Sequence, residues 1–526
     1  MHNPATDITL RSLLGLRAAC GLLTVLLAFG GGPPLPAATP SDTLVVGKAA
    51  DPHNLDPAVT MDNNDWTVTY PSYQRLVGLV KNTTDVTGDL AQSWQPSKDN
   101  LSWTFHLKKG FMFDDGSPVD AAAVKFSFDR LMKVAQGPSE SFPSDLKCEV
   151  VDPVTVKFSM KEVCPYFLSA LAIDGAAIIN PKVMDHAENG DLAKTYLSSH
   201  TAGSGAFRLT SWNKAQSLVL EQNPYWPGKK PALKKMVVKI IAEPSSRRLQ
   251  LESGDLDIIE TLPVDQIAEV AKKPNVAVAQ NPSMLCYYLY LNCKKPPLNN
   301  AALRQAISWA VDYNGIINSI MKGQALQMRG PVPSGMWGGD PSTLPYHTDL
   351  AKAKDILAKN NLSNITLGFL YSSRDPNWEP IVLSTQAQLA QVGITVKLES
   401  MANTTMRERL NKADFDLSIG VWSPDFADPM MFMNCWFEES RKGLAGNRSW
   451  YDNPTVDKMV REAASMTDQK ERTKLYIQAQ KIIAVDAPYV YLFQRNSQVA
   501  MSKKVRGFIF NPLLEQIFNV DTITKE

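Results

Sequence analysis

Between residues 380 and 422 the sequence changes from a helical to an extended pattern, and this change constrains the fold strongly. The helical segment begins at Pro380-Ile381-Val382-Leu383 and ends at Gly393. Ile394–Leu398 then alternates apolar and polar residues as a strand does, and Asp416–Trp422 has the composition of a short buried strand. A helix, a glycine and a strand in succession are typical of parallel strands joined by helices. We therefore predict an α/β lobe here.

Three further helices are expected around this segment. The first follows Asn299-Asn300, carries apolar residues on one side and ends at Gly323. The second starts near Asn453-Pro454, and the third runs from about Asp468 to Asp486. The last two complete the predicted lobe.

Residues 70 to 200 have a different pattern, with short strands and hairpins around a single helix. Ser117–Asp120 opens that helix with a capping residue, a proline in the first turn and an acidic residue. Large aromatic residues alternate with polar ones here, and we interpret them as core: Trp94, Trp103, Phe105, Phe111 and Phe113.

The first 38 residues are predicted to be a cleavable signal peptide. Arg11 and Arg17 form a basic flank, Ala18–Phe29 is an apolar run of a dozen residues, and glycines and prolines follow. The run is shorter than the ~20 residues of a membrane span. Cys20 precedes the apolar run, which argues against a lipid-modified cysteine. We expect cleavage after Ala37 or Ala38, and export of the mature chain.

The charge balance argues against partners that a protein attracts over long distances through its net charge. The chain has 54 Lys and Arg against 53 Asp and Glu, a formal net charge of +1. Removing residues 1–38, which contain two arginines and one aspartate, leaves a charge of zero. No nucleic acid partner and no adhesion to anionic lipid are therefore expected.

Five cysteines remain after the signal peptide, an odd number that leaves at least one free thiol. Cys148 and Cys164 flank a predicted hairpin and are the most plausible disulfide pair in an oxidising compartment. The alternative interpretation is that most of the five are small buried apolar residues.

Motifs of catalysis and metal binding are missing from the sequence. We find no Gly-x-Ser-x-Gly elbow, no His-Glu-x-x-His and no Walker loop. The five histidines after residue 38 are isolated, so neither a metal site nor a cofactor is predicted.

One long motif and several shorter ones point to a known family. Trp103–Val119 (WTFHLKKGFMFDDGSPV) is the most specific run, and Asp51–Pro57, Gly203–Leu209 and Trp422–Pro429 accompany it in order. These segments resemble the family 5 solute-binding proteins of ABC importers, the group that includes dipeptide, oligopeptide and nickel binders. The resemblance extends from about residue 42 onward.

The resemblance implies a two-lobed α/β periplasmic-binding-protein fold, with two crossing segments and an extra α+β subdomain on lobe I. Lobe I would comprise 39–68, 204–283 and 494–526. The subdomain would span 69–203, and lobe II would span 284–493. Ligand would be enclosed between the lobes by hinge closure.

The resemblance also implies ligand-binding residues. Asp425, in the loop after the Gly-x-Trp strand, would pair with the α-ammonium of a peptide, and Trp422 would form a flat apolar wall. Arg374 would pair with the peptide carboxylate. Asn64 and Trp66 would contact the ligand from lobe I. Alternatively, the carboxylate of Asp425 could cap a turn or a helix. We expect Asp428, rather than Asp425, to have that structural role.

The expected function is that of a non-enzymatic, monomeric, periplasmic binding component of an ABC importer. It would capture short peptides and deliver them to an inner-membrane permease, whose cytoplasmic partner subunits hydrolyse ATP. The same fold could instead bind an opine, a γ-glutamyl compound, an oligosaccharide or a metal chelate. A secreted hydrolase is the alternative from another class, and it would need a nucleophile and a base in the cleft.

Overall fold

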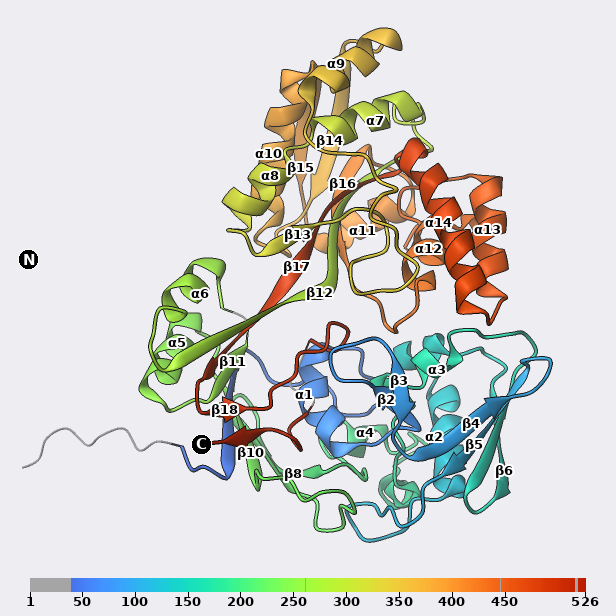
Figure 1. Cartoon of the computed structure of the whole chain (residues 1–526), viewed down its shortest axis with the longest axis vertical. Helices are drawn as coiled ribbons and strands as arrows, with labels where there is room; N and C mark the ends of the chain where they lie inside the picture. The colour runs from blue at the N-terminus through green and yellow to red at the C-terminus, as the bar shows by residue number, and fades with distance from the viewer. Residues whose placement is uncertain (1–38, 261, 445, 516–518) are drawn as a thin grey trace, which may run out of the picture. The chain divides into compact units, whose positions relative to one another are not determined.

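The computed structural model describes nearly all of the chain after the predicted signal peptide: residues 39–260, 262–444, 446–515 and 519–526 (Figure 1). Residues 1–38, to which the signal peptide was assigned, lie outside the described residues. None of the described helices combines the length and apolar character that a membrane span requires. We keep the names lobe I, subdomain and lobe II for the ranges predicted above.

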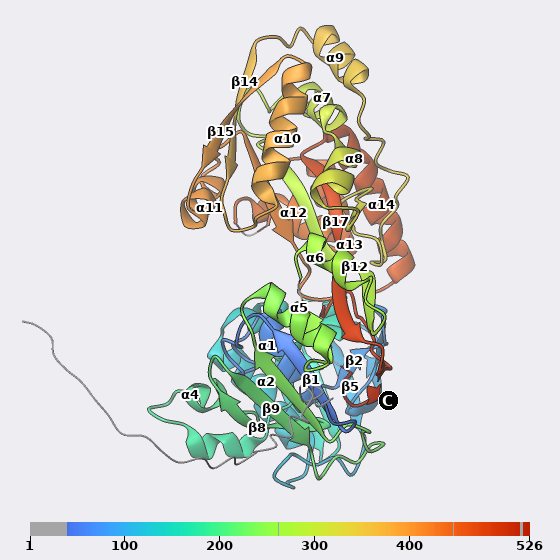
Figure 2. The ribbon, with the colours of Figure 1, turned by 90° about the vertical axis from the view of Figure 1, so that its left-hand side faces the viewer.

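The helix–glycine–strand succession predicted between 380 and 422 is confirmed. Helix α10 spans Trp378–Gln391, and strand β15 spans Ile394–Ser400. Gly393 between them has a φ of +84°, a backbone conformation that favours glycine because it has no Cβ. Strand β14 (Ile365–Tyr371) pairs in parallel with both β15 and β16 (Leu417–Trp422). Helix α10 packs against β14 and β15 (Figure 2).

Lobe II contains most of the long helices, and two of the three expected near 300–486 have the predicted bounds. The elements are β12 Val276–Leu291, α7 Ala301–Ala310, α8 Tyr313–Gly315, η4 Ile316–Ile320, β13 Ala325–Gln327, α9 Leu350–Lys359, α11 Asn403–Asn411, α12 Met430–Phe437, η5 Glu439–Arg441, α13 Pro454–Ala464, α14 Gln469–Asp486 and β17 Tyr489–Ser502. The helix expected to reach Gly323 instead ends at Ala310. There Val311 is extended, and the Asp312 side chain accepts a bond from the Gly315 amide and starts a new turn.

One mixed sheet runs through both lobes. Its order is β15-β14-β16-β12-β17-β11-β1-β10-β9-β8, and β13 pairs with β17. The long antiparallel strands β12 and β17 belong to both halves, because β12 pairs with β16 and β17 pairs with β11 (Figure 1). The strands of lobe II are therefore joined to those of lobe I by continuous main-chain hydrogen bonding.

The described residues of lobe I form short strands and three helices. They are β1 Thr43–Lys48, α1 Asn63–Ser72, β8 Phe207–Asn213, β9 Ser217–Gln222, β10 Lys235–Ile240, α5 Pro244–Ser253, β11 Ile258–Glu260, α6 Val264–Val270, β18 Val505–Arg506 and β19 Thr524–Lys525. Alternate residues of β9 and β10, including Leu218, Leu220, Met236 and Val238, fill one core of this lobe.

The predicted subdomain forms its own antiparallel sheet, with the order β4-β5-β7-β6. Residues 69–203 include β2 Val77–Leu79, β3 Val86–Gly88, β4 Ala91–Pro96, β5 Ser102–Leu107, α2 Ala121–Val134, η1 Gly137–Ser141, β6 Lys147–Asp152, β7 Thr155–Ser159, α3 Phe167–Ala170, η2 Asp174–Ala176, η3 Pro181–His186 and α4 Lys194–Leu197. Of the five aromatic residues expected in the core, Phe105 and Phe113 are fully buried, whereas Trp94, Trp103 and Phe111 are partly buried and pack against it. The cap of α2 is Asp120 rather than Ser117, because the Asp120 side chain accepts from the Ala123 amide.

The predicted boundaries between the lobes fall inside strands. The boundary at 283/284 lies in β12 at an irregularity of register between Pro282 and Cys286, and the boundary at 493/494 lies in β17. Because both strands pass through these points without a break, the domain limits stay a prediction.

The disulfide predicted between Cys148 and Cys164 is not formed, and both residues are buried free thiols. Cys148 lies on β6, where α2 packs, and Asp129 and Lys125 of that helix are among the charges that act on it. Cys164 instead lies near Tyr166, Asp428 and Arg472. The two thiols have different surroundings, so flanking one hairpin did not bring them together. Burial raises the pKa of each to about 12.

Candidate functional site

The end of strand β16 is shaped by a glycine. Gly420 lies beside Tyr290 of β12, and a side chain at Gly420 would overlap the Tyr290 ring and hydroxyl. With that space open, the Tyr290 hydroxyl accepts a hydrogen bond from Nη1 of Arg448 at 2.9 Å. The Gly-x-Trp pattern therefore has a packing reason, since the glycine allows a tyrosine to hold an arginine next to the strand that carries Trp422.

The loop 423–429 is anchored at its far end. Both guanidinium Nη atoms of Arg472 donate to the carboxylate of Asp428, at 2.7 and 2.8 Å, and the amide of Met430 donates to it at 2.9 Å. Asp428 is 2% exposed, so it is the structural carboxylate that the sequence predicted. Phe426 of the same loop stacks on Tyr166 of the subdomain, with ring centroids 4.7 Å apart.

Asp425 differs from Asp428 in both its exposure and its lack of partners. Its side chain is exposed, and within the described residues its carboxylate has neither an ion pair nor a hydrogen bond. Protein atoms nevertheless crowd the carboxylate, and this desolvation, together with the negative charge of Glu140, raises the pKa of Asp425 to about 6. A recessed but accessible carboxylate without a cation is suited to binding a cationic group from solution.

Trp422 presents a half-buried ring three residues before Asp425. Its ring meets Trp436 edge to face at 6.4 Å, and the guanidinium carbon of Arg448 lies 5.3 Å from its centroid. The indole Nε1 is buried and has no hydrogen-bond acceptor. Trp422 therefore lies beside a positively charged side chain and precedes Asp425 by three residues in the chain.

Three arginines form that positive region, which we call the arginine cluster: Arg374, Arg407 and Arg448. None of them forms a salt bridge with a carboxylate within the described residues. Arg448 is 9% exposed, and its Nε is buried without a partner. Burial lowers the pKa of Arg407, and the positive charges of Arg448 and Arg374 lower it further. Such mutual repulsion without a counter-charge is a property of anion-binding sites.

The arginine cluster contains one predicted residue and two that the sequence did not indicate. Arg374 lies exposed in the turn that follows β14. Arg407 comes from helix α11 and Arg448 from the loop before α13. No spacing in the sequence connects these segments. What identifies them is that no described carboxylate forms a salt bridge with any of the three guanidinium groups, and this is a tertiary property.

The two lobe I residues predicted to contact ligand, Asn64 and Trp66, both lie on helix α1. The side-chain amide of Asn64 donates to the carbonyl oxygens of Ala50 and Asp51, at 3.1 and 2.6 Å. Trp66 is 9% exposed, meets Tyr70 edge to face at 6.0 Å, and has a buried Nε1 without an acceptor. These contacts tie both residues to lobe I, and their role toward a ligand stays a prediction.

Acidic groups that could hold a metal ion lie elsewhere in the described chain. Two sets have ligand atoms within 4.8 Å of one another: His53, Asp62 and Asp65, and Glu439, Asp452 and Asp457. Asp65 already accepts bonds from the amides of residues 53 and 54 and from the Thr60 hydroxyl. Asp452 pairs with Lys442 at 2.7 Å. Internal partners therefore account for both carboxylates, and we assign no metal to either set.

The fold and these features place the chain in a known class. Residues 85–443 match the model of bacterial extracellular solute-binding proteins, family 5 (middle region), and the chain belongs to this family. Its structure is the α/β fold of periplasmic binding proteins of that type, as predicted. It aligns with a DppA periplasmic binding protein from Helicobacter pylori in complex with the peptide STSA, with a TM-score of 0.76 and 29% identity over 92% of this chain and 98% of that one.

Two curated relatives cover almost the whole chain. A probable D,D-dipeptide-binding periplasmic protein, DdpA of Escherichia coli K12, is 57% identical over 494 residues, which are 93% of this chain and 95% of that protein. A glutathione-binding protein, GsiB of Salmonella paratyphi A, is 28% identical over 94% of this chain and 96% of its own length. The structure of HbpA2 from Haemophilus parasuis superposes with a TM-score of 0.84 at 26% identity, covering 92% of this chain and all of that one.

Proposed function

We propose that this protein is the periplasmic substrate-binding component of an ABC importer and that it binds short peptides with two free termini. It captures the peptide between its lobes and delivers it to an inner-membrane permease, while partner subunits hydrolyse ATP. Family membership and the names of the relatives support the transport role. The site near Trp422 supports the kind of cargo.

One observation carries the choice of cargo. An uncompensated carboxylate, Asp425, follows the end of β16, where Trp422 lies beside Arg448 of the uncompensated arginine cluster. Enclosing a ligand's ammonium or carboxylate without a counter-charge costs several kcal/mol, so a site that offers unpaired charges of both signs favours a zwitterion. The ammonium of a peptide pairs with Asp425, and its terminal carboxylate pairs with the arginine cluster.

The first cargo to test is a D,D-dipeptide. The relative with 57% identity is named as a probable binder of such peptides. A dipeptide carries its two charges a few bonds apart, and it offers only two side chains to be accommodated. We propose D-alanyl-D-alanine as the reference ligand, with the L,L form as its matched comparison.

A second cargo class is a more acidic solute, such as a γ-glutamyl compound. Three arginines against one aspartate give the site an excess of positive charge, and a relative with 28% identity is named as a glutathione-binding protein. Opines, oligosaccharides and metal chelates are weaker candidates, because they lack either the free ammonium or the carboxylates that this site complements.

We propose a binding role without catalysis, in a monomer. The relatives are named as binding proteins, and the site combines Asp425 with arginines rather than a nucleophile with a base. A hydrolase would leave cleaved products after incubation with a peptide mixture, whereas a binder returns intact peptides. Size-exclusion chromatography with light scattering tests whether the protein is a monomer in solution.

The decisive experiment is calorimetry with end-blocked ligands. The mature protein is titrated with D-alanyl-D-alanine, with its N-acetyl form and with its C-terminal amide. We expect the free dipeptide to bind and both blocked forms to bind at least about tenfold more weakly, since each loses one charge-assisted contact. Equal binding of the blocked forms contradicts the proposal. Mass spectrometry of ligand that co-purifies then identifies the natural cargo.

A further inference from the structure

The turn that carries Arg374 joins strand β14 to helix α10 and is anchored at both ends. Ser372 at its start and Trp378 at its end are buried. The amide of Trp378 donates to the carbonyl oxygen of Asp375 at 3.1 Å, which starts the helix. Between these anchors the side chain of Arg374 is exposed. The turn therefore presents Arg374 to solvent from a fixed backbone.

Asp375 is the carboxylate next to Arg374 in the chain, yet the two form no salt bridge in the described structure. Both of its carboxylate oxygens have other donors. Oδ1 accepts from the backbone amide of Asn377 at 2.9 Å and from its Nδ2 at 3.0 Å. Oδ2 accepts from the hydroxyl of Tyr287 at 2.6 Å. The negative charge that could neutralise Arg374 is thus held by other partners.

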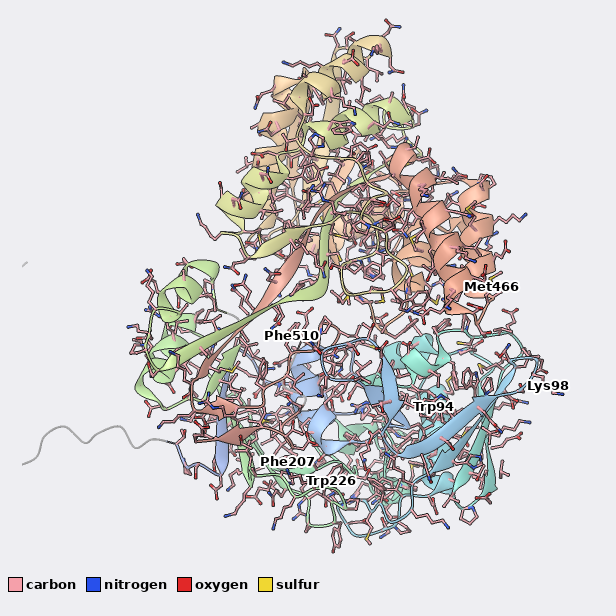
Figure 3. All side chains as sticks on the ribbon, viewed as in Figure 1. Trp94, Lys98, Phe207, Trp226, Met466 and Phe510 are labelled. Carbon is pink, nitrogen blue, oxygen red and sulfur yellow. The ribbon has the colours of Figure 1, made fainter. Side chains whose placement is uncertain are left out.

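Tyr287 comes from strand β12, at a point where the pairing with β17 is irregular. Residues 287 and 288 of β12 face residues 493 and 491 of β17, so one residue of β17 is left over between them. A bulge of this kind changes the direction of the side chains around it. The buried ring of Tyr287 stacks on Phe493, with centroids 4.6 Å apart. The two strands run side by side here, and Figure 3 shows their side chains.

The hydroxyl of Tyr287 is a hydrogen-bond donor at neutral pH. Burial raises the pKa of Tyr287, and the positive charge of Arg495 opposes this shift only in part. The phenol therefore stays protonated and donates to Asp375. A hydrogen bond to a carboxylate is about twice as strong as one between neutral groups. The bond keeps Asp375 in the arrangement in which it forms no salt bridge with Arg374.

We propose that Tyr287 is a positioning residue for the carboxylate of the ligand: by holding Asp375, it leaves the guanidinium of Arg374 free to bind that carboxylate. This inference rests on the proposed function, in which Arg374 belongs to the arginine cluster. Without the hydroxyl, Oδ2 of Asp375 loses its donor, and Arg374 is the adjacent cation that replaces it. A salt bridge within the turn then competes with the peptide.

The test measures how strongly the protein prefers a free carboxyl terminus. Titration calorimetry compares D-alanyl-D-alanine with its C-terminal amide, in the mature wild-type protein and in Tyr287→Phe. The variant keeps the ring that stacks on Phe493, and thermal unfolding checks that it folds. We expect the free dipeptide to bind Tyr287→Phe about tenfold more weakly and the amide to bind both proteins equally. Equal losses for the two ligands indicate a structural role and overturn the proposal.

Two double variants test the route through Asp375 and Arg374. Adding Asp375→Asn to Tyr287→Phe removes the competing charge, so it should restore most of the lost affinity. Adding Tyr287→Phe to Arg374→Met should cause no further loss, because the guanidinium that it affects is already absent. Additive losses in either pair overturn the proposal.

Failure of the proposed function gives a different result. If the wild-type protein binds the free dipeptide and its amide equally, the arginine cluster does not bind the ligand carboxylate, and both proposals are wrong. If the wild-type protein prefers the free dipeptide and Tyr287→Phe keeps the full preference, only the positioning role of Tyr287 is overturned.

Discussion

Arg448 donates a hydrogen bond from Nη1 to the hydroxyl of Tyr290, 2.9 Å away, and no carboxylate within the described residues pairs with this guanidinium. The phenol orients the arginine without neutralising it. Its positive charge is therefore available to a ligand, and this relationship underlies the predictions that follow.

Replacing Arg448 by methionine should weaken binding of D-alanyl-D-alanine by roughly 10- to 100-fold, since a hydrogen bond to a charged group contributes about 1.5–3 kcal/mol. Arg448→Lys should not restore affinity, because an ammonium lacks the planar fork of the guanidinium. Titration calorimetry measures the dipeptide affinity of both variants. Tyr290→Phe is the control that removes the hydroxyl and keeps the charge, and we expect a smaller loss from it. Wild-type affinity in Arg448→Met would contradict the assignment.

Helix α11 offers a matched pair of arginines. Arg407 has no acidic partner, whereas Arg409 pairs with Glu399 at 2.7 Å and with Asp414 at 2.9 Å. Arg407→Met should lower dipeptide affinity about tenfold and leave the melting temperature unchanged or raised, because it removes repulsion within the arginine cluster. Arg409→Met should leave affinity unchanged. Titration and thermal unfolding of both variants check this, and equal effects on affinity would refute it.

The two aspartates of the 423–429 loop should separate binding from stability. Asp425→Asn should abolish or severely weaken binding of peptides with free amino termini without unfolding the protein, because its carboxylate has no internal partner. Asp428→Asn should destabilise the fold by about 3–5 kcal/mol, since it leaves Arg472 buried without its counter-charge. Urea unfolding and calorimetry distinguish the two effects. A stable Asp428→Asn, or an Asp425→Asn that binds normally, is the contrary result.

Binding should depend on pH near the pKa of Asp425, about 6. Affinity should be level above pH 7 and should fall about tenfold between pH 7 and pH 5, because protonation removes the partner of the ammonium. The stability of the ligand-free protein should change with pH in the opposite direction to the affinity. The folded state holds this proton more tightly than the unfolded state, so this group's contribution to stability falls as pH rises through 6. Calorimetry of the wild-type protein across this range measures the affinity, and urea unfolding compared with that of Asp425→Asn, which lacks this titrating group, measures the effect on stability.

The cysteines should behave as buried thiols. Reducing agent should leave the melting temperature unchanged, because the structure contains no bond between Cys148 and Cys164. In denaturant, alkylation should add five groups to the mature chain, whereas the native protein should react slowly, since burial raises the pKa of both thiols. Three adducts in unreduced, denatured protein would instead indicate one disulfide.

Local patterns in the sequence were sufficient to predict many of the helices and strands. Helix α10, strand β15 and helix α14 follow from apolar periodicity with a glycine or a capping aspartate at their ends, because these signals act over a few residues. The same reasoning overextended the helix after Asn300, since the cap formed by Asp312 interrupts it. It also proposed a disulfide from a hairpin whose flanking thiols lie in different surroundings.

The sequence by itself determined the family, the α/β class, and the strand end and loop that carry Trp422 and Asp425, since each depends on residues close together in the chain. Only the tertiary structure decided which charges remain unpaired. Asp428 is neutralised by Arg472 and Asp425 is not, and Arg407 and Arg448 meet because α11 and the loop before α13 converge beside β16. Electrostatic compensation depends on distances between segments that are remote in sequence, and the packing of the sheet and its helices sets those distances.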